Sequence, residues 1–211
     1  MGRDTGERDA GRGTVTSIEE LETLYPWHDG MERKVTPGLT GLQARYVESS
    51  PFVLVATVGP EGVDCSPRGD PAGFVRIVDE RTLLMPDRRG NNRVDTLRNI
   101  VRDGRIALLF LVPGIDVTLR VNGRARLLVC PALRETFAVD GKAPTSVIEV
   151  TIDEVYTQCP KALVRSDFWN AEHRTHDDIP TVGQIMQEIV EGFDGASYDA
   201  GYPEHMARTI Y

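Results

Sequence analysis

The chain has 211 residues, of which 40% are hydrophobic and 27% are charged, and its formal net charge is −8 at pH 7. These values are typical of one soluble globular domain with additional segments at its ends, and the negative net charge argues against a nucleic-acid-binding protein. No apolar run reaches membrane-spanning length and no signal peptide opens the chain, so we expect a cytoplasmic protein that does not bind a membrane.

The N-terminal part of the chain is predicted to carry a tail and two helices. Residues 1–16 are rich in Gly, Arg and Asp, and we expect them to be disordered. Ser17 followed by Glu20 forms a capping-box pattern that predicts a short helix. The Trp-His pair at 27–28 is typical of a packed corner, and residues 40–50 are predicted to form the second helix.

Apolar alternation then predicts an antiparallel β region with connecting helices. We expect strands at residues 52–58, 63–66, 74–78, 82–85, 106–112, 117–129 and 148–152. We expect helical segments at residues 92–103, 132–139, 160–169 and 181–191. Residues 194–211 carry three tyrosines with little periodicity, and we expect them to lie on a neighbouring surface.

The strand at 117–129 admits two readings, because Asn122-Gly123 can form a two-residue hairpin turn. Such a hairpin would place Val121 opposite Arg124 on one face and break the apolar alternation. The alternation runs unbroken through Gly123, so one long strand with a kink at that glycine is predicted. Six or seven such strands with few helices predict a small closed barrel.

The cysteines and histidines give no sign of a metal centre. Cys65, Cys130 and Cys159 are far apart in sequence, and we expect all three to be buried free thiols. His173 and His176, followed by two aspartates, have a metal-like composition but no third patterned ligand, so no metal site is predicted.

The central stretch of the chain concentrates positive charge. Between Asp87 and Arg105 there are six arginines and three aspartates. Asn92 is a plausible helix N-cap with Asp95 as an imperfect capping partner, and Gly104 is placed to end the helix. Val94, Leu97 and Val101 are spaced so that they would share one apolar face of this helix.

A strand, a Gly/Asn turn and a helix start bring free backbone N–H groups and Arg93 to one point, which is typical of a phosphate site. The alternative from charge and spacing alone is a surface helix whose arginines are solvated.

Four segments occur together in one order: Ser66–Asp70, Pro86–Arg93, Leu119–Arg126 and Cys159–Ser166 followed by Trp169. Together they resemble the FMN-binding split-barrel flavoproteins of the pyridoxamine 5′-phosphate oxidase-like superfamily, in the branch described as pyridoxamine 5′-phosphate oxidase-related. The resemblance covers roughly residues 40 to 170. It implies a mainly β (α+β) fold, a six- to seven-stranded antiparallel split barrel with peripheral helices.

The resemblance also implies the domain organisation and the partners. An FMN-binding barrel domain would span residues 17–170, and a helical extension at 171–211 would pack on the barrel or on a second subunit. The protein would be a homodimer with FMN at the subunit interface, acting on a small-molecule substrate.

Individual roles follow from the same resemblance. Asn92 and Arg93 would hold the FMN phosphate, and Arg68 would reach the phosphate or the ribityl chain. The segment from Met85 to Asp87 would run alongside the flavin ring, and the helix after Cys159 would approach the flavin from the other subunit. The implied cofactor-binding residues are Ser66, Arg68, Met85, Pro86, Asp87, Asn91, Asn92, Arg93, Lys161, Ala162, Arg165 and Trp169.

The predicted function is that of an FMN-dependent oxidoreductase with an unidentified substrate, in which the flavin supplies the chemistry and no catalytic side chain is identified. Gln158 stands where members of this branch often carry His, and the last six residues differ from the substrate-binding end of genuine pyridoxamine 5′-phosphate oxidases. We therefore expect another substrate. The alternatives are a non-catalytic flavin- or haem-binding barrel and a deazaflavin-dependent reductase.

Overall fold

The computed structural model describes residues 13–26, 30, 32–174 and 179–211, and the chain divides into two units, residues 1–34 and 35–211. The first unit contains α1 (Ile18–Leu24) and the 3-10 helix η1 (Glu32–Lys34). Ser17 caps α1 as predicted, since its hydroxyl accepts the N–H of Glu20. The capping box is incomplete, however, because the carboxylate of Glu20 accepts the N–H of Thr16 instead of that of Ser17.

Two sequence predictions for the N-terminal part of the chain concern residues that the structure does not describe. The Trp-His pair at 27–28 and residues 1–12 of the predicted tail lie outside the described residues. The division into a barrel domain at 17–170 and an extension at 171–211 stays a prediction.

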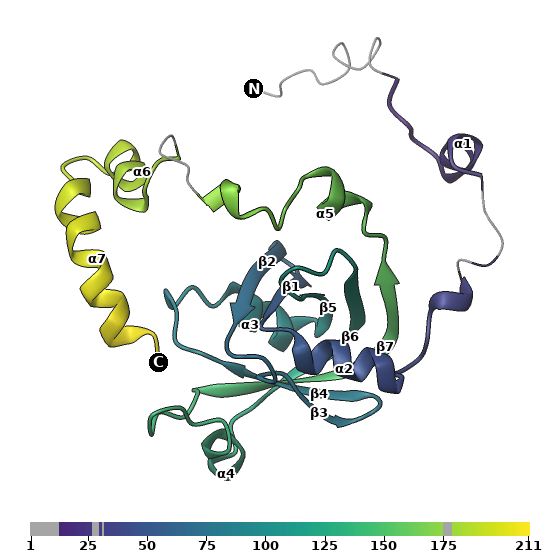
Figure 1. Cartoon of the computed structure of the whole chain (residues 1–211), viewed down its shortest axis with the longest axis horizontal. Helices are drawn as coiled ribbons and strands as arrows, with labels where there is room; N and C mark the ends of the chain where they lie inside the picture. The colour runs from purple at the N-terminus through teal and green to yellow at the C-terminus, as the bar shows by residue number, and fades with distance from the viewer. Residues whose placement is uncertain (1–12, 27–29, 31, 175–178) are drawn as a thin grey trace. The chain divides into compact units, whose positions relative to one another are not determined.

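Seven antiparallel strands form one sheet in residues 35–211, which confirms the predicted α+β fold (Figure 1). The strands are β1 (Phe52–Gly59), β2 (Gly62–Gly69), β3 (Arg76–Asp79), β4 (Thr82–Asp87), β5 (Arg105–Leu111), β6 (Thr118–Leu128) and β7 (Ser146–Gln158). Their order is β2-β1-β5-β6-β7-β4-β3. Within the described residues no ladder joins the two outer strands, β2 and β3. The barrel is therefore split, whereas the number of strands alone had suggested a closed barrel.

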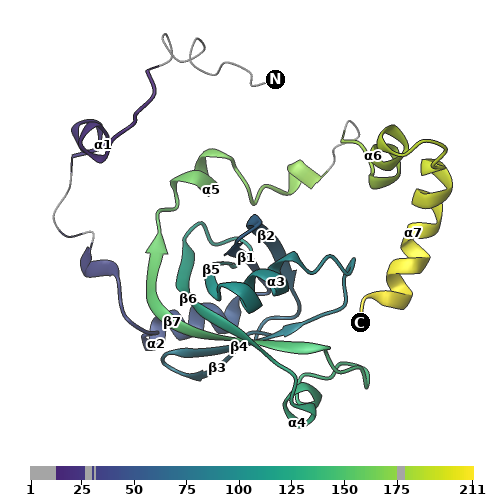
Figure 2. The ribbon, with the colours of Figure 1, turned by 180° about the vertical axis from the view of Figure 1, so that it is seen from behind.

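The long strand β7 connects the two halves of the sheet (Figure 2). It pairs with β6 over most of its length and with β4 over its first half. The core lies inside this curved sheet, where Phe110, Leu83, Met85 and Leu108 are fully buried or nearly so. Burial of each such side chain contributes about 1.5–3 kcal/mol to folding.

The single-strand prediction for the segment around Gly123 is confirmed, since β6 runs without a turn from Thr118 to Leu128. Asn122 pairs with Glu154 and Gly123 with Ile152, so Asp153 is the extra residue of a bulge in β7. A Cβ at Gly123 would lie 2.1 Å from the carbonyl oxygen of Thr151. The close approach of β6 and β7 at this bulge therefore requires a residue without a side chain at position 123.

The helices of this unit are α2 (Gly41–Ser49), α3 (Asp95–Arg102), α4 (Pro131–Glu135), α5 (Lys161–Arg165), α6 (Val182–Ile189) and α7 (Gly195–Thr209), with the 3-10 helix η2 (Ala171–Arg174). Helix α7 lies in the C-terminal segment for which the resemblance implied a helical extension, although the weak periodicity of residues 194–211 did not show a helix there. Its side chains are mostly exposed, so it lacks the apolar stripe that marks a buried helix. It packs on α6, where the backbones of Gly183 and Gly195 approach so closely that a Cβ on either would clash.

The cysteine prediction is half right. Cys65, Cys130 and Cys159 are free thiols, but all three are exposed. Cys65 lies on β2 at one end of the sheet, and the other two lie just outside strand ends, where a thiol has no core to enter. None of the helices in the described ranges is long and apolar enough to span a lipid bilayer.

Candidate functional site

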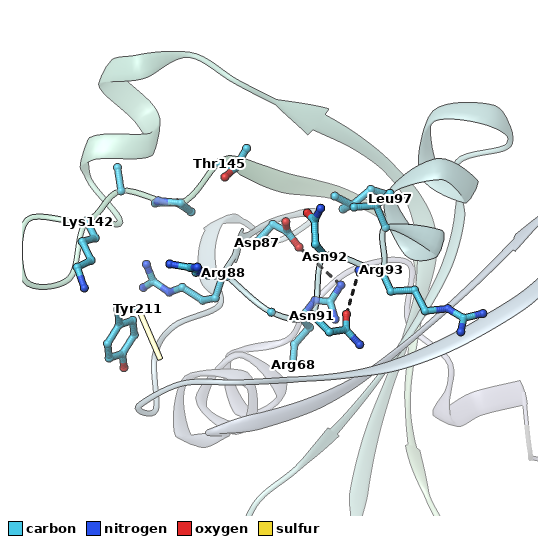
Figure 3. Close-up of a pocket in the computed structure, with 15 residues that line it drawn as sticks. Arg68, Asp87, Arg88, Asn91, Asn92, Arg93, Leu97, Lys142, Thr145 and Tyr211 are labelled. Carbon is cyan, nitrogen blue, oxygen red and sulfur yellow. Dashed lines mark hydrogen bonds and ion pairs between the residues drawn. The ribbon is translucent and has the colours of Figure 1, made fainter. Parts of the chain in front are cut away.

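A cavity of about 750 Å³ lies where β4 ends and the chain turns into α3 (Figure 3). Its wall is built by Arg68 at the end of β2, the loop at 87–93, the first turn of α3, the segment 142–145 and Tyr211. Five cationic side chains and one carboxylate line it: Arg68, Arg88, Arg89, Arg93 and Lys142 against Asp87. The charged loop identified in the sequence therefore forms one wall of a cavity.

The loop differs from the predicted helix start. Asn92 is not the N-cap, because its φ of 59° is left-handed, a conformation that asparagine tolerates better than most residues. The side chain of Asn91 accepts the N–H of Arg93 at 3.0 Å and so closes a local turn. Helix α3 begins at Asp95 after Val94, which has no capping side chain. The first N–H groups of α3 thus lack a side-chain cap.

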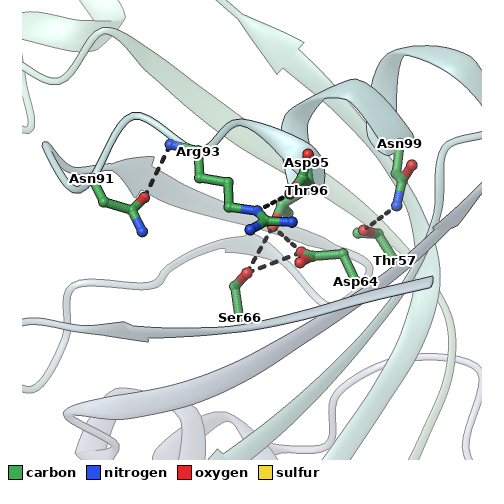
Figure 4. Close-up of polar contacts among 8 residues, drawn as sticks. All are labelled: Thr57, Asp64, Ser66, Asn91, Arg93, Asp95, Thr96 and Asn99. Carbon is green, nitrogen blue, oxygen red and sulfur yellow. Dashed lines mark hydrogen bonds and ion pairs between the residues drawn. The ribbon is translucent and has the colours of Figure 1, made fainter. Parts of the chain in front are cut away.

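The buried face of α3 is also different from the predicted one. Val101 is 74% exposed, whereas Thr96, Asn99 and Ile100 are buried. The two polar side chains can be buried because both are hydrogen-bonded (Figure 4). Thr96 donates to the carboxylate of Asp64, and Asn99 donates to a threonine hydroxyl on β1. Burial of a polar side chain is tolerated when it is hydrogen-bonded, a possibility that apolar spacing alone does not show. Gly104, with a φ of 82°, follows the end of the helix as predicted.

Arg93 points away from the centre of the cavity. Its side chain is 80% exposed and forms an ion pair with Asp95. Figure 4 shows its guanidinium above a polar cluster in which Asp64 accepts hydrogen bonds from Ser66 and Thr96. Asp95, with a smaller contribution from Asp64, raises the pKa of Arg93. Two carboxylates therefore already offset the charge of this arginine.

Arg68 lies largely buried in the cavity wall. Its side chain is 22% exposed, with one guanidinium nitrogen 3.6 Å from Asp87 and another bonded to the carbonyl of Pro67 at 3.1 Å. Its Nε is buried and has no hydrogen-bond partner among the described residues. The hydroxyl of Ser146, next to Thr145 in the cavity wall, is in the same state. A buried N–H without a partner calls for an acceptor, which can be an ordered water, an ion or a ligand.

Asp87 lies beside this arginine in the cavity wall. Burial raises the pKa of its carboxyl group above the usual value, and the charge of Arg68 opposes that rise. The carboxylate thus depends on Arg68 for its only ion pair in the described part of the chain.

A second network fixes the other side of the cavity. Arg88 donates to Asp70 and to the carbonyl of Phe137, both at 2.7 Å. The hydroxyl of Tyr211 donates to the second oxygen of Asp70 at 2.7 Å, and this bond together with burial raises the pKa of Tyr211. Asp70, only 3% exposed, therefore holds an arginine and the C-terminal tyrosine in place.

Of the twelve residues predicted for the site, five line the cavity: Arg68, Asp87, Asn91, Asn92 and Arg93. Ser66 lies in the neighbouring cluster around Asp64, and Met85 and Pro86 are buried at the end of β4. The remaining four, Lys161, Ala162, Arg165 and Trp169, lie on and after α5 and do not line this cavity in their own chain. Their role stays a prediction.

Sequence reasoning missed Arg88, Arg89, Lys142, Thr145 and Tyr211. Arg88 and Arg89 lie inside a segment that carried the resemblance, so a closer reading of that segment could have included them. Lys142 and Tyr211 carry no local signal, because only the tertiary fold brings them to the loop. In the described ranges no group of three or more His, Cys, Asp or Glu could hold a metal ion, and the side chains of residues 173–178, which include both histidines of the His-rich segment, are not among those described.

The sheet order and the position of the cavity define an α+β split-barrel protein with a cationic pocket at the β4–α3 loop. The family model described as pyridoxamine 5′-phosphate oxidase matches residues 39–159, more than half of the chain. The chain belongs to this family.

Solved structures with similar folds include HupZ from Group A Streptococcus, with 18% identity, 56% of this chain and 93% of that chain covered, and a TM-score of 0.47. A protein related to general stress protein 26, from Clostridium acetobutylicum, has 18% identity, coverage of 54% and 83%, and a TM-score of 0.42. An FMN-binding protein from Syntrophomonas wolfei has 12% identity, coverage of 55% and 84%, and a TM-score of 0.42. No curated protein matches the chain.

Proposed function

We propose that this chain binds FMN in the cavity at the β4–α3 loop and acts as an FMN-dependent oxidoreductase on a small molecule. The observation that carries the proposal is the buried, unbonded Nε of Arg68 in a wall with five cations and one carboxylate. Membership of the pyridoxamine 5′-phosphate oxidase family supports a flavin as the anion that this wall would bind.

The cavity residues fit a phosphate group. A phosphate dianion needs charge-assisted donors, and arginine provides them in a fork geometry. Arg88 and Arg93 form short ion pairs with carboxylates, whereas Arg68 lies 3.6 Å from Asp87 and keeps one buried N–H without a partner among the described residues. The uncapped N-terminus of α3 adds backbone N–H groups and the positive end of a helix dipole. We therefore assign Arg68 as the main phosphate anchor, with Arg93 in a lesser role.

The rest of the wall fits a flat ring. Val94, Leu97 and Pro144 offer apolar surface in the same cavity. The β3–β4 ladder ends at Leu84, so the last three residues of β4 pair with β7 on one side only. Of these three residues only Asp87 lines the cavity, so its backbone groups are the ones that would orient the polar edge of a ring. When bound, FMN supplies hydride or single-electron chemistry, and the residues named here bind it, orient it and exclude water.

A homodimer would complete the site. Lys161 and Arg165 lie on the one-turn helix α5 and are exposed, and Trp169 follows close behind with its indole N–H on the carbonyl of Ile115. None of them lines the cavity of their own chain. The exposure of Lys161 and Arg165 supports the proposal that this segment reaches the flavin bound by a second copy.

The test of flavin binding compares FMN with riboflavin, which lacks the phosphate. The purified protein is stripped of flavin and titrated with each, and the quenching of flavin fluorescence is followed. FMN should bind at least about tenfold more tightly, since charge-assisted contacts to the phosphate are lost with riboflavin. Equal affinities, or no binding of FMN, would overturn the proposal.

Catalysis is tested separately from binding. The loaded protein is reduced anaerobically with dithionite, and its reoxidation by an added quinone is compared with that of free reduced FMN. Faster reoxidation of the bound flavin supports an oxidoreductase. Reoxidation no faster than that of free FMN contradicts it and favours a protein that only binds flavin.

A further inference from the structure

A second cavity of about 850 Å³ lies beside the first, between α7 and the same loop. Residues 88–91 and Tyr211 line both cavities and so form the shared wall. The phosphate site does not account for this second space. Its size is in the usual range for a small-molecule pocket, about 300–1,000 Å³.

Helix α7 gives this cavity an aromatic and apolar side. Tyr198, Tyr202 and Met206 are spaced four residues apart and therefore share one face of the helix. The rings of the two tyrosines are 5.7 Å apart, and the three side chains remain 38–40% exposed. The described part of the chain does not fill the space in front of them. Flat tyrosine rings and a flexible thioether are suited to contact with a planar molecule.

The charge of the cavity comes from the shared wall. Arg88 is bonded to Asp70 and to a backbone carbonyl, and both oxygens of Asp70 are occupied. Arg89 is exposed and has no ion-pair partner among the described residues. The cation left to meet a ligand therefore lies at the junction of the two cavities.

We propose that the second cavity binds a planar aromatic anion, such as an aromatic carboxylate, with its ring against Tyr198, Tyr202 and Met206 and its charge on Arg89. This inference rests on the proposed function, since it makes the occupant the small molecule that meets the flavin in the adjoining cavity. Tyr211, held by Asp70, lines both cavities and is therefore placed beside both ligands.

The test uses the protein loaded with FMN and the probe 2-naphthoate. Binding is measured by isothermal titration and by the change in flavin absorption, since an aromatic molecule beside the flavin alters its spectrum. We expect saturable binding, weaker by about tenfold or more for the neutral naphthalene-2-carboxamide, because the charge-assisted contact with Arg89 is then lost.

A cavity-filling variant locates the site. Met206→Trp should reduce the affinity for 2-naphthoate by about tenfold or more, because the larger side chain occupies the space in front of the tyrosines. The affinity for FMN should not change, since Met206 does not line the first cavity. Val182→Trp, on an exposed position of α6, is the matched control and should bind the probe as the wild type does.

The outcomes separate the two proposals. Failure of FMN to bind contradicts the proposed function itself. Normal FMN binding with no binding of 2-naphthoate, or with equal binding by Met206→Trp, overturns the second site. If a second copy of the chain covers α7, the probe does not bind and Met206→Trp changes the oligomeric state on size-exclusion chromatography, which also overturns it.

Discussion

Replacement of Arg68 distinguishes the phosphate anchor suggested by the structure from the one suggested by the sequence. Arg68→Ala removes a guanidinium that is 22% exposed and keeps one buried N–H without a partner. Arg93→Ala removes one that is 80% exposed and already paired with Asp95. Both arginines line the same cavity, so the comparison holds the ligand and the site constant.

The expected magnitudes follow from these environments. A hydrogen bond to a charged group contributes about 1.5–3 kcal/mol, and about 1.4 kcal/mol changes an affinity tenfold. Arg68→Ala should therefore weaken FMN binding by about 10- to 150-fold. An exposed pair contributes about 0–1 kcal/mol, so Arg93→Ala should weaken binding by no more than about fivefold.

The assay is fluorescence titration of each flavin-free variant with FMN and with riboflavin. The loss in Arg68→Ala should be confined to FMN, because riboflavin has no phosphate for the guanidinium. Arg126→Ala is a suitable control, since Arg126 is exposed, pairs with Glu149 and lies outside the cavity. Urea unfolding of each variant shows whether removal of the cation beside Asp87 disturbs the fold.

A larger loss in Arg93→Ala than in Arg68→Ala would refute the reasoning from burial and bonding. It would mean that Arg93 leaves Asp95 and turns into the cavity when the ligand binds. An equal loss of FMN and riboflavin affinity in Arg68→Ala would instead show that the arginine contacts another part of the flavin.

Three further predictions concern stability and ionisation. Gly123→Ala should lower the free energy of unfolding by about 1–3 kcal/mol in urea, because its Cβ would lie 2.1 Å from a carbonyl oxygen of β7. Asp87→Asn should raise the melting temperature at neutral pH, and the gain should vanish below pH 4, because burial raises the folded pKa of Asp87 above 3.8 and the fold is penalised only when the group is ionised. The bond to Asp70 and burial raise the pKa of Tyr211, so its phenol should ionise above pH 10. In a pH titration followed by tyrosinate absorbance, Tyr211→Phe should lack this phenol.

Each of these has a result that contradicts it. Gly41→Ala, where nothing lies within 4 Å of the added Cβ, is the control for Gly123, and equal effects would rule out the proposed clash. A pH-independent gain in Asp87→Asn would exclude ionisation as its cause. For Tyr211, a phenol lost in the variant that ionises at or below pH 10 in the wild type would show that its pKa is not raised.

The sequence by itself predicted the seven strands, their antiparallel class and the continuity of the segment through Gly123, because alternating apolar side chains report which face of a strand is buried. It gave two strands too short, since β2 spans Gly62–Gly69 and β7 spans Ser146–Gln158 where residues 63–66 and 148–152 were expected. It also determined that the cationic stretch lies between a strand and a helix. The resemblance gave the family, which the family model confirms. These features are local in the chain, so local patterns are sufficient to predict them.

Only the tertiary structure decided how the cations are used. The buried face of α3 is set by hydrogen bonds of Thr96 and Asn99 to residues more than 30 positions away, which no periodicity records. The position of Tyr211 beside Asp70 depends on contacts across 141 residues of sequence. Arg68 and Arg93 carry the same charge in the sequence. They differ in the structure because Arg68 is largely buried, 3.6 Å from Asp87 and with an unbonded Nε, whereas Arg93 is exposed and bonded to Asp95.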